Sequence, residues 1–176
     1  NLKLCAPKPA RTQSPKTLCV TSLQTLQNKM DEIILDSLTE IEELKCILKL
    51  EAKAQNYLES FKWCKSVKNS WCDKEYCIYD NIGVFLFEIE PINSEVDDFV
   101  WIVVGDLPSV YLDKSVKTGR ECLQTYCELM QDWVDNVNSG KSLAESYPIP
   151  AEPNRKNADL LISRILFIQE ELLRDE

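Results

Sequence analysis

Two apolar segments in the middle of the chain decide its fold. They read F-V-W-I-V-V-G-D-L-P at Phe99–Pro108 and, before it, G-V-F-L-F-E-I-E-P at Gly83–Pro91. No other segments are as dense in the β-branched and aromatic residues that favour strands. Because the loop between them is short and polar, we expect them to pair as one antiparallel hairpin, residues 83–106.

A turn centred on Asn93 and Ser94 sets the register of this hairpin. It predicts three cross-strand pairs: Val84 with Val104, Leu86 with Ile102, and Glu88 with Val100. The other face then carries a set of large apolar residues: Phe85, Phe87, Ile89, Phe99, Trp101 and Val103. Both faces are apolar over most of their length, so the hairpin is expected to be covered on both sides.

The G-D-L-P sequence at the end of the second strand is typical of a tight strand exit. Gly105 lets the chain bend, Asp106 can bond the following backbone, and Pro108 cannot continue a ladder of hydrogen bonds. The alternative interpretation is a catalytic Asp106.

Apolar periodicity predicts helices on both sides of the hairpin. A long helix is expected over residues 21–53 and a second helical stretch over 55–69, which can continue the first. A short extra strand is expected around Tyr76 and Ile78, and residues 109–116 are expected to be a connector. Two further helices are expected, from Thr118 to a cap at Gly140 and from Asn154 or Asn157 to about Arg174.

The predicted fold class is therefore α+β. A small antiparallel sheet of two to four strands, built on the central hairpin 83–106, packs with a long N-terminal helix and two C-terminal helices. Residues 1–20 are polar, basic and contain Pro7, Pro9 and Pro15, so they are expected to form an extended arm. Residues 21–176 are expected to form a single domain.

The charge of the chain restricts its partners. The net charge is −9, yet residues 1–21 carry +4, which leaves −13 on the remainder. Residues with so large a negative charge repel the phosphate backbone of nucleic acids, and nucleic-acid binding is therefore not expected. A cationic protein partner would suit this charge. Simple solubility is the alternative explanation of the charge. No apolar run approaches the roughly 20 residues that span a bilayer, and no membrane association is expected.

The composition excludes most familiar enzyme chemistry. The chain has no histidine, which rules out Ser-His-Asp and Cys-His nucleophile systems and histidine metal ligands. Four glycines cannot build a dinucleotide-binding loop, and there is no Walker motif. No cofactor is expected.

The cysteines are interpreted as reduced thiols of a cytoplasmic protein. There are eight of them, at residues 5, 19, 46, 64, 72, 77, 122 and 127. The chain is long enough to bury a core without a disulfide framework. The pairs Cys72/Cys77 and Cys122/Cys127 have spacings that suit one zinc ion poorly, so no metal site is expected. A disulfide between Cys72 and Cys77 is the alternative for that pair.

Carboxylates are the remaining candidates for a site. In the predicted register Glu88, Glu90 and Asp98 share one face near the turn, and Glu95 and Asp97 lie in the loop. Such a cluster can keep a sheet edge soluble, receive Lys and Arg side chains from a partner, or hold a divalent metal. An exposed aromatic beside it would mark a binding surface. The predicted partner-binding residues are Glu88, Glu90, Glu95, Asp97, Asp98, Asp106 and Tyr111.

From about Tyr57 to Leu173 the chain resembles a group of small, uncharacterised bacterial proteins. The motifs that carry the resemblance are Y-L-E-S-F-K-W-C (57–64), W-I-V-V-G-D-L-P (101–108), C-L-Q-T-Y-C-E-L-M-Q-D-W (122–133), S-Y-P-I (146–149) and L-L-I-S-R-I (160–165). The resemblance brings no activity and no catalytic residue. In size and acidity these proteins look like the immunity partners that bacteria encode beside toxins.

Two functions from different classes follow. The first is a non-enzymatic protein-binding module, in its specific form an immunity protein that neutralises a cationic bacterial toxin through an acidic surface. The alternative is a carboxylate-based, metal-dependent enzyme that uses Asp106 with Glu88, Glu90 or Asp98. A homodimer through the long N-terminal helix is compatible with either function.

Overall fold

The computed structural model describes residues 15–174; for residues 15–26 and 31–35 only the backbone is described. The chain divides into two units, residues 1–42 and residues 43–176. Helix α1 comprises Pro15–Glu59, so its residues up to 42 belong to the first unit and the rest to the second. Most of the predicted arm, residues 1–14, lies outside the described residues, and residues 15–20 are helical.

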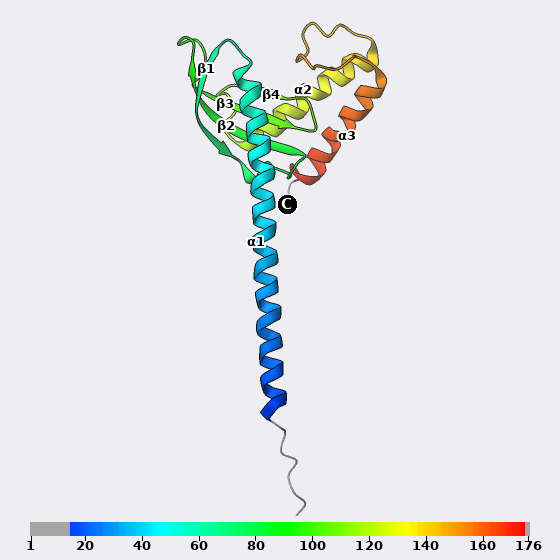
Figure 1. The fold of residues 1–176 in the computed structure, drawn as a ribbon. Coiled ribbons are helices and arrows are strands. Elements are labelled where there is room, and N and C mark those ends of the chain that lie inside the picture. Colours follow the sequence, from blue (N-terminus) through cyan, green and yellow to red (C-terminus); the bar gives the residue numbers. More distant parts are fainter. Residues whose placement is uncertain (1–14, 175–176) are drawn as a thin grey trace, which may run out of the picture. The chain divides into compact units, whose positions relative to one another are not determined.

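The second unit contains a four-stranded antiparallel sheet in the order β1-β2-β3-β4 (Figure 1). The strands are β1 (Cys64–Cys72), β2 (Ile82–Pro91), β3 (Phe99–Gly105) and β4 (Val110–Leu112). Helices α2 (Gly119–Ser139) and α3 (Arg155–Glu171) follow, and a short 3-10 helix, η1 (Lys74–Tyr76), lies between β1 and β2. This confirms the predicted α+β class, with the central hairpin formed by β2 and β3.

The register of that hairpin differs from the prediction by one residue. Val84 pairs with Val103 and Leu86 with Trp101, and the amide of Ile89 donates to the carbonyl of Asp98 over 2.8 Å. The predicted register assumed a tight turn at Asn93 and Ser94, whereas residues 92–98 form a longer loop. Since a one-residue slip moves every side chain of a strand to the other face, the predicted face assignment of β3 was wrong as well.

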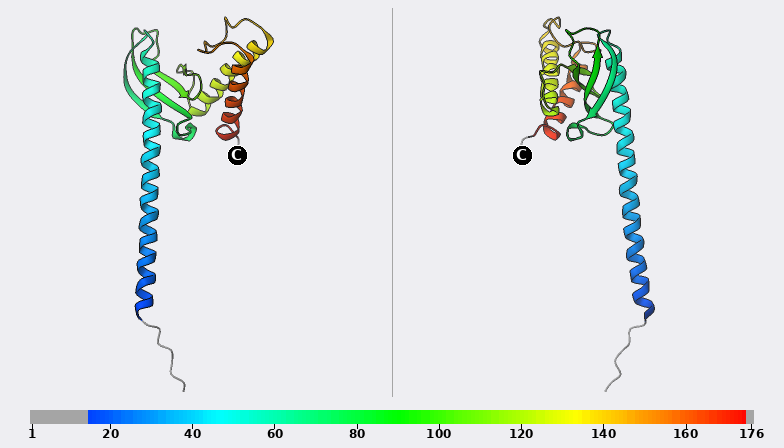
Figure 2. Two further views of the ribbon diagram at one scale, coloured as in Figure 1. Left: turned by 45° about the vertical axis from the view of Figure 1, so that its right-hand side comes forward. Right: turned by 90° about the vertical axis from the view of Figure 1, so that its left-hand side faces the viewer.

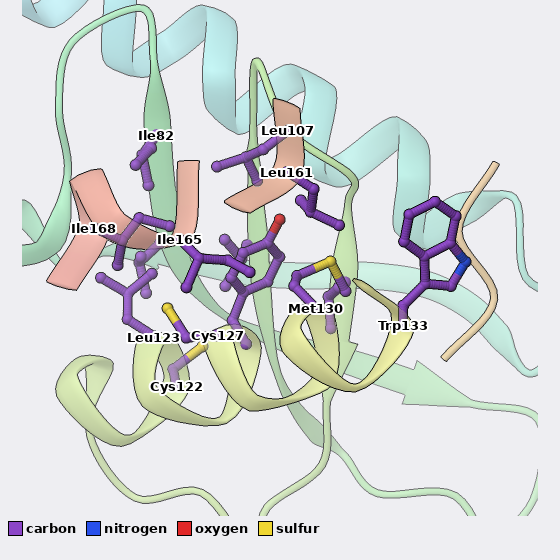
Figure 3. Packing of buried hydrophobic residues seen from close by; sticks show 14 of the residues in the cluster. Ile82, Leu107, Cys122, Leu123, Cys127, Met130, Trp133, Leu161, Ile165 and Ile168 are labelled. Atoms are coloured by element: carbon purple, nitrogen blue, oxygen red, sulfur yellow. The ribbon is translucent and has the colours of Figure 1, made fainter. Parts of the chain in front are cut away.

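The sheet is covered on both faces, as the two-sided apolar pattern predicted (Figure 2). Helices α2 and α3 pack on the face that carries Ile82, Val84, Trp101, Val103 and Val110. Figure 3 shows this core, in which side chains of α2 meet those of α3. Its helical members are Cys122, Leu123, Tyr126, Cys127, Met130, Trp133, Val134, Ala158, Leu161, Ile165 and Ile168.

Residues 43–59 of α1 cover the opposite face. Ile47, Leu50, Ala54 and Leu58 recur at three- and four-residue steps and are buried, which is the spacing of one helix face. They pack on the alternating inward residues of two strands: Phe85, Phe87, Ile89, Val100, Ile102 and Val104. Gly83 leaves room for this contact, because a Cβ there would lie 3.2 Å from Leu50.

The predicted helix over residues 55–69 was wrong beyond Glu59, because residues 64–72 form the edge strand β1. Two irregularities interrupt the pairing of β1 with β2, between Cys64 and Ser66 and between Val67 and Asn69. Bulges insert extra residues, so the inward positions Cys64, Val67 and Ser70 follow at steps of three instead of two. This spacing imitates the periodicity of a helix.

Two other short segments also differ from the prediction. Tyr76 ends the 3-10 helix, and Ile78 makes only an isolated bridge to Ile82, so the expected extra strand around these residues does not form there. The predicted connector over residues 109–116 contains β4, which pairs with β3 through Val110, Tyr111 and Leu112.

The two C-terminal helices begin at predicted caps; α2 ends at the predicted Gly140, and α3 ends at Glu171, before the predicted end near Arg174. The side chain of Thr118 accepts a hydrogen bond from the amide of Glu121, and Gly140 ends α2 with a φ of 65°. The side chain of Asn154 accepts from the amide of Asn157 at the start of α3. At the exit of β3, Gly105 has a φ of 156°, and a Cβ there would collide with the carbonyl of Asn81, so the position requires glycine.

In the first unit, the described side chains of α1 include Met30, Leu38 and Ile41, which are exposed. Among the residues that the structure describes, no helix combines the length and the hydropathy that a membrane crossing requires.

Candidate partner-binding surface

Five aromatic side chains of the second unit gather into one cluster. They are Tyr57, Phe61, Trp63, Tyr111 and Tyr147. The ring centroids of Phe61 lie 5.1 Å from Tyr57, 5.2 Å from Trp63 and 5.0 Å from Tyr111, and those of Tyr111 and Tyr147 are 6.3 Å apart. Such spacings are favourable for aromatic pairs, so the cluster is a cohesive surface. All five side chains are half-buried.

The first three members come from the end of α1 and the turn that follows it. Tyr57 lies in the last turn of the helix, and the amide of Phe61 donates to the carbonyl of Leu58 over 3.2 Å. Trp63 is held to the loop after β2, because its carbonyl accepts from the amide of Ile92 over 2.9 Å. The turn therefore places both rings beside the sheet.

Tyr111 comes from the short edge strand β4. It is paired with Ile102 of β3, on the face that α1 covers, whereas the preceding Val110 is buried on the α2 face. This alternation is the ordinary pleat of a strand, and it directs the Tyr111 ring toward Phe61 and Trp63.

Tyr147 lies in the proline-containing loop between α2 and α3. The loop is tied to α2 at the preceding residue. The hydroxyl of Ser146 donates to the carboxylate of Asp132 over 2.6 Å and accepts from the side-chain amide of Asn136 over 2.9 Å. These bonds give an otherwise irregular segment a fixed attachment next to the cluster.

A hydrogen-bond network joins three of the tyrosines. The hydroxyl oxygen of Tyr147 accepts from the backbone amide of Tyr111 over 3.3 Å and lies 3.1 Å from the hydroxyl oxygen of Tyr57. Burial and the hydrogen bond with Tyr147 raise the pKa of Tyr57 well above its ordinary value, so its phenol stays protonated. The hydroxyl groups of Tyr57 and Tyr147 are thus bonded within the cluster, while part of each ring remains accessible.

The cluster lines a cavity of about 500 Å³, which we call the aromatic groove. Its walls are the rings of Tyr57, Phe61, Tyr111 and Tyr147 together with Ser109, Pro148, Ile149 and Pro150. Concave sites lined mainly by aromatic and apolar groups with a few polar atoms are typical of ligand binding.

A second cavity, of about 300 Å³, also borders Tyr111, and we call it the acidic recess. It is lined by Trp63, Glu95, Val96, Asp97, Val100, Tyr111 and Asp113. Tyr111 also lines the aromatic groove, so the two cavities are neighbours that share one side chain.

The carboxylates of the acidic recess differ in their surroundings. Asp97 lies 2.6 Å from the ammonium of Lys114 and accepts from the Lys114 amide, and these hydrogen bonds lower the pKa of Asp97. Asp113 accepts from Ser115, which lowers the pKa of Asp113. Glu95 is exposed at the rim. Asp97 and Asp113, whose pKa values are both lowered, are therefore anionic at neutral pH.

Of the seven predicted site residues, the structure brings Glu95, Asp97 and Tyr111 together in this surface. Glu88 and Glu90 are not part of it. The carboxylate of Glu90 lies 2.5 Å from the ammonium of Lys65, and that of Glu88 accepts from the side-chain amide of Asn69 over 2.7 Å. Both carboxylates therefore bind residues of the edge strand β1.

The predicted grouping of Asp98 with Glu88 and Glu90 depended on the wrong register. Glu88 pairs with Phe99, whereas the predicted partner was Val100. Asp98 therefore lies on the face of the hairpin opposite to Glu88 and Glu90. Asp106 lies at the far end of β3 and forms an ion pair with Arg164 of α3. Eight residue steps of extended chain, about 26 Å, separate Asp98 from Asp106. The carboxylates of the predicted enzyme site therefore do not meet in one place.

Within the described part of the chain, no three Cys, Asp or Glu side chains converge on a position where they could hold one metal ion. The aromatic members Tyr57, Phe61, Trp63 and Tyr147 were not predicted as site residues. The sequence signal that could have found them is the concentration of aromatic residues just after the long helix, at residues 57–63.

Comparison of the chain with models of protein families, with curated proteins and with solved structures found no match. The resemblance to uncharacterised bacterial proteins therefore remains a prediction, and the surface is interpreted from its own chemistry.

Proposed function

We propose that this protein is a protein-binding module that holds a cationic segment of its partner on the surface formed by the aromatic groove and the acidic recess. The observation that carries the proposal is that the two cavities share Tyr111. The face of an aromatic ring attracts Lys and Arg side chains, and the adjacent carboxylates of Glu95, Asp97 and Asp113 attract the same groups. The net charge of −9 supports a basic partner.

The specific form of this proposal is an immunity protein of bacterial and cytoplasmic origin whose partner is a cationic toxin. Its support is the acidity of the chain together with the binding surface, because an acidic face steers association with a basic protein and speeds it. In this form the protein neutralises its partner by occupying it and catalyses no reaction on it.

The proposal is tested by comparing what two tyrosine variants capture from a lysate of the cells that produce the protein. Tyr111→Ala removes the ring shared by both cavities. Tyr79→Ala is the matched control, because Tyr79 is 41% exposed and bonds Glu43 outside the surface. We expect a basic protein to be retained by the unaltered protein and by Tyr79→Ala, and to be lost with Tyr111→Ala. Equal retention by both variants would contradict the proposal.

We also propose, as predicted, that the chain forms a homodimer through α1. In the first unit Met30, Leu38 and Ile41 are about half exposed, and in the second unit Leu44 and Leu48 are 53% and 52% exposed. Apolar side chains at such spacing on a helix are typical of a surface that another helix covers. Sedimentation equilibrium of the unaltered protein and of Leu44→Glu with Leu48→Glu should show a dimer and a monomer, respectively.

A further inference from the structure

Two cysteines of the second unit lie side by side at the edge of the sheet. Cys72 ends β1, the 3-10 helix η1 reverses the chain, and Cys77 follows it. Their sulfur atoms are 3.4 Å apart, and both thiols are partly accessible. Neither Cys72 nor Cys77 is in a disulfide, so this proximity joins two reactive groups that are not bonded to each other.

Backbone hydrogen bonds fix the position of this pair. The amide of Asp73 donates to the carbonyl of Val84 over 2.9 Å, which holds the end of β1 against β2. The amide of the same Val84 donates to the sulfur of Cys77 over 3.3 Å. A single residue of β2 therefore anchors both sides of the turn, and the two sulfur atoms are held within reach of each other.

The contacts also assign different roles to the two thiols. The two sulfur atoms share a hydrogen bond that either thiol can donate, and Cys77 also accepts from the backbone amide of Val84. These hydrogen bonds lower the pKa of Cys77, whereas the hydrogen bond with Cys77 and burial raise the pKa of Cys72. The thiolate is the nucleophilic form of cysteine. Cys77 is therefore the attacking group, and Cys72 is the group that resolves the intermediate.

We propose that Cys72 and Cys77 form a thiol–disulfide exchange site whose co-reactant is a low-molecular-weight disulfide such as oxidised glutathione. The sulfur of Cys77 attacks one sulfur of glutathione disulfide, a mixed disulfide forms, and one glutathione leaves as its thiol. Cys72 then loses its proton and attacks the sulfur of Cys77, which forms the Cys72–Cys77 bond and releases the second glutathione. The protein loses two protons and two electrons, and glutathione disulfide gains them to become two glutathione thiols.

The turn between the two cysteines contacts the start of α2, so its geometry after oxidation bears on the packing of that helix. The carboxylate of Asp73 accepts a hydrogen bond from the amide of Gly119, the first residue of α2. Tyr76 and Cys77 pack against the core on the α2 side of the sheet. A disulfide would fix the turn that makes these contacts, so the oxidised protein should keep its fold.

The experiment exposes the folded protein to oxidised glutathione, blocks the remaining thiols with iodoacetamide and digests the product with trypsin. Cleavage after Lys74 separates the two cysteines. Mass spectrometry should therefore find peptide 69–74 joined by a disulfide to peptide 75–114. The internal control is Cys122 and Cys127, which have the same spacing but lie buried on a helix, where burial raises the pKa of Cys127 to about 12. These two thiols should remain reduced.

Single variants separate the two steps. Cys72→Ser should accumulate a glutathione adduct on Cys77, and Cys77→Ser should react with glutathione disulfide at least about tenfold more slowly. The proposal is overturned if the unaltered protein keeps a stable glutathione adduct, or if Cys72 and Cys77 stay as unreactive as Cys122 and Cys127. Circular dichroism of the oxidised protein checks that the fold is retained in either case.

Discussion

Tyr126 and Tyr147 place the same side chain in two different kinds of region. Tyr126 is fully buried in the core between the sheet and helices α2 and α3, and its hydroxyl is, among the described residues, a buried polar atom with no hydrogen-bond partner. Tyr147 is half-buried at the aromatic groove, and its hydroxyl oxygen bonds with Tyr111 and lies beside that of Tyr57. In the core the tyrosine ring fills space, whereas in the groove the hydroxyl of Tyr147 is hydrogen-bonded and the ring stays partly accessible, as a binding surface requires.

The largest expected difference between the two regions is in stability. Tyr126→Ala should lower the free energy of unfolding by about 3–5 kcal/mol, because it leaves a large cavity in a closed core. Tyr111→Ala should lower it by about 1–2 kcal/mol, because that ring is only half-buried. Urea unfolding followed by circular dichroism measures both values. An equal loss of unfolding free energy in the two variants would show that Tyr111 contributes to stability as a core residue does, which would contradict the comparison.

The next effect concerns charge at the acidic recess. Glu95→Lys should weaken binding of a basic partner by about tenfold, or about 1.4 kcal/mol, mainly by slowing association. Glu128→Lys is the matched control, because Glu128 is an exposed acid on α2 outside the surface. Stopped-flow association rates at low and high salt distinguish the two variants. If Glu128→Lys slows association as much as Glu95→Lys, only the net charge matters and the recess has no special role.

A smaller effect sharpens the contrast at the two hydroxyl groups. Tyr126→Phe should raise the free energy of unfolding by about 1 kcal/mol, because it removes a buried hydroxyl that has no partner. Tyr147→Phe should lower it by a similar amount, because it removes an acceptor for the Tyr111 amide. Thermal unfolding of the two variants side by side gives the signs. Destabilisation by Tyr126→Phe would show that this hydroxyl is bonded after all.

The smallest effect is the pH dependence of the recess. The hydrogen bond with Lys114 lowers the pKa of Asp97 below the ordinary value of 3.8. A carboxylate with a lowered pKa in the folded state stabilises the fold above its unfolded pKa and loses that contribution as the pH falls through the folded pKa. Asp97→Asn should therefore flatten the decline of the melting temperature below about pH 3.8. Identical pH profiles of the two proteins would show that the interaction of Asp97 with Lys114 does not stabilise the fold.

The elements with explicit local signals could be predicted from the sequence. The hairpin was visible because both strands are dense in aromatic and β-branched residues such as Phe85, Phe87 and Ile89, and α2 because Thr118 and Gly140 mark its ends. The edge strand β1 was missed because its bulges put Cys64, Val67 and Ser70 at three-residue steps. The register was wrong because loop length fixes it, and a single sequence does not show where a seven-residue loop such as 92–98 closes.

The candidate surface was predicted only in part, for a different physical reason. Three of the predicted residues, Glu95, Asp97 and Tyr111, line one recess, whereas Tyr147 reaches the cluster from a loop after α2. Its place depends on hydrogen bonds between side chains far apart in the chain, such as that of Tyr147 with the amide of Tyr111. Periodicity and turn signals contain no information about contacts of that kind.

Site-specific photocrosslinking tests the central claim most directly. A benzoylphenylalanine residue is introduced at position 111 in one protein and at position 79 in another, and both are irradiated in the lysate that contains the partner. The account predicts a covalent complex with one basic protein from position 111 and none from position 79, and competition by an arginine-rich peptide should diminish it. Crosslinking of the same partner from position 79 alone would show that the partner binds elsewhere and would contradict the account.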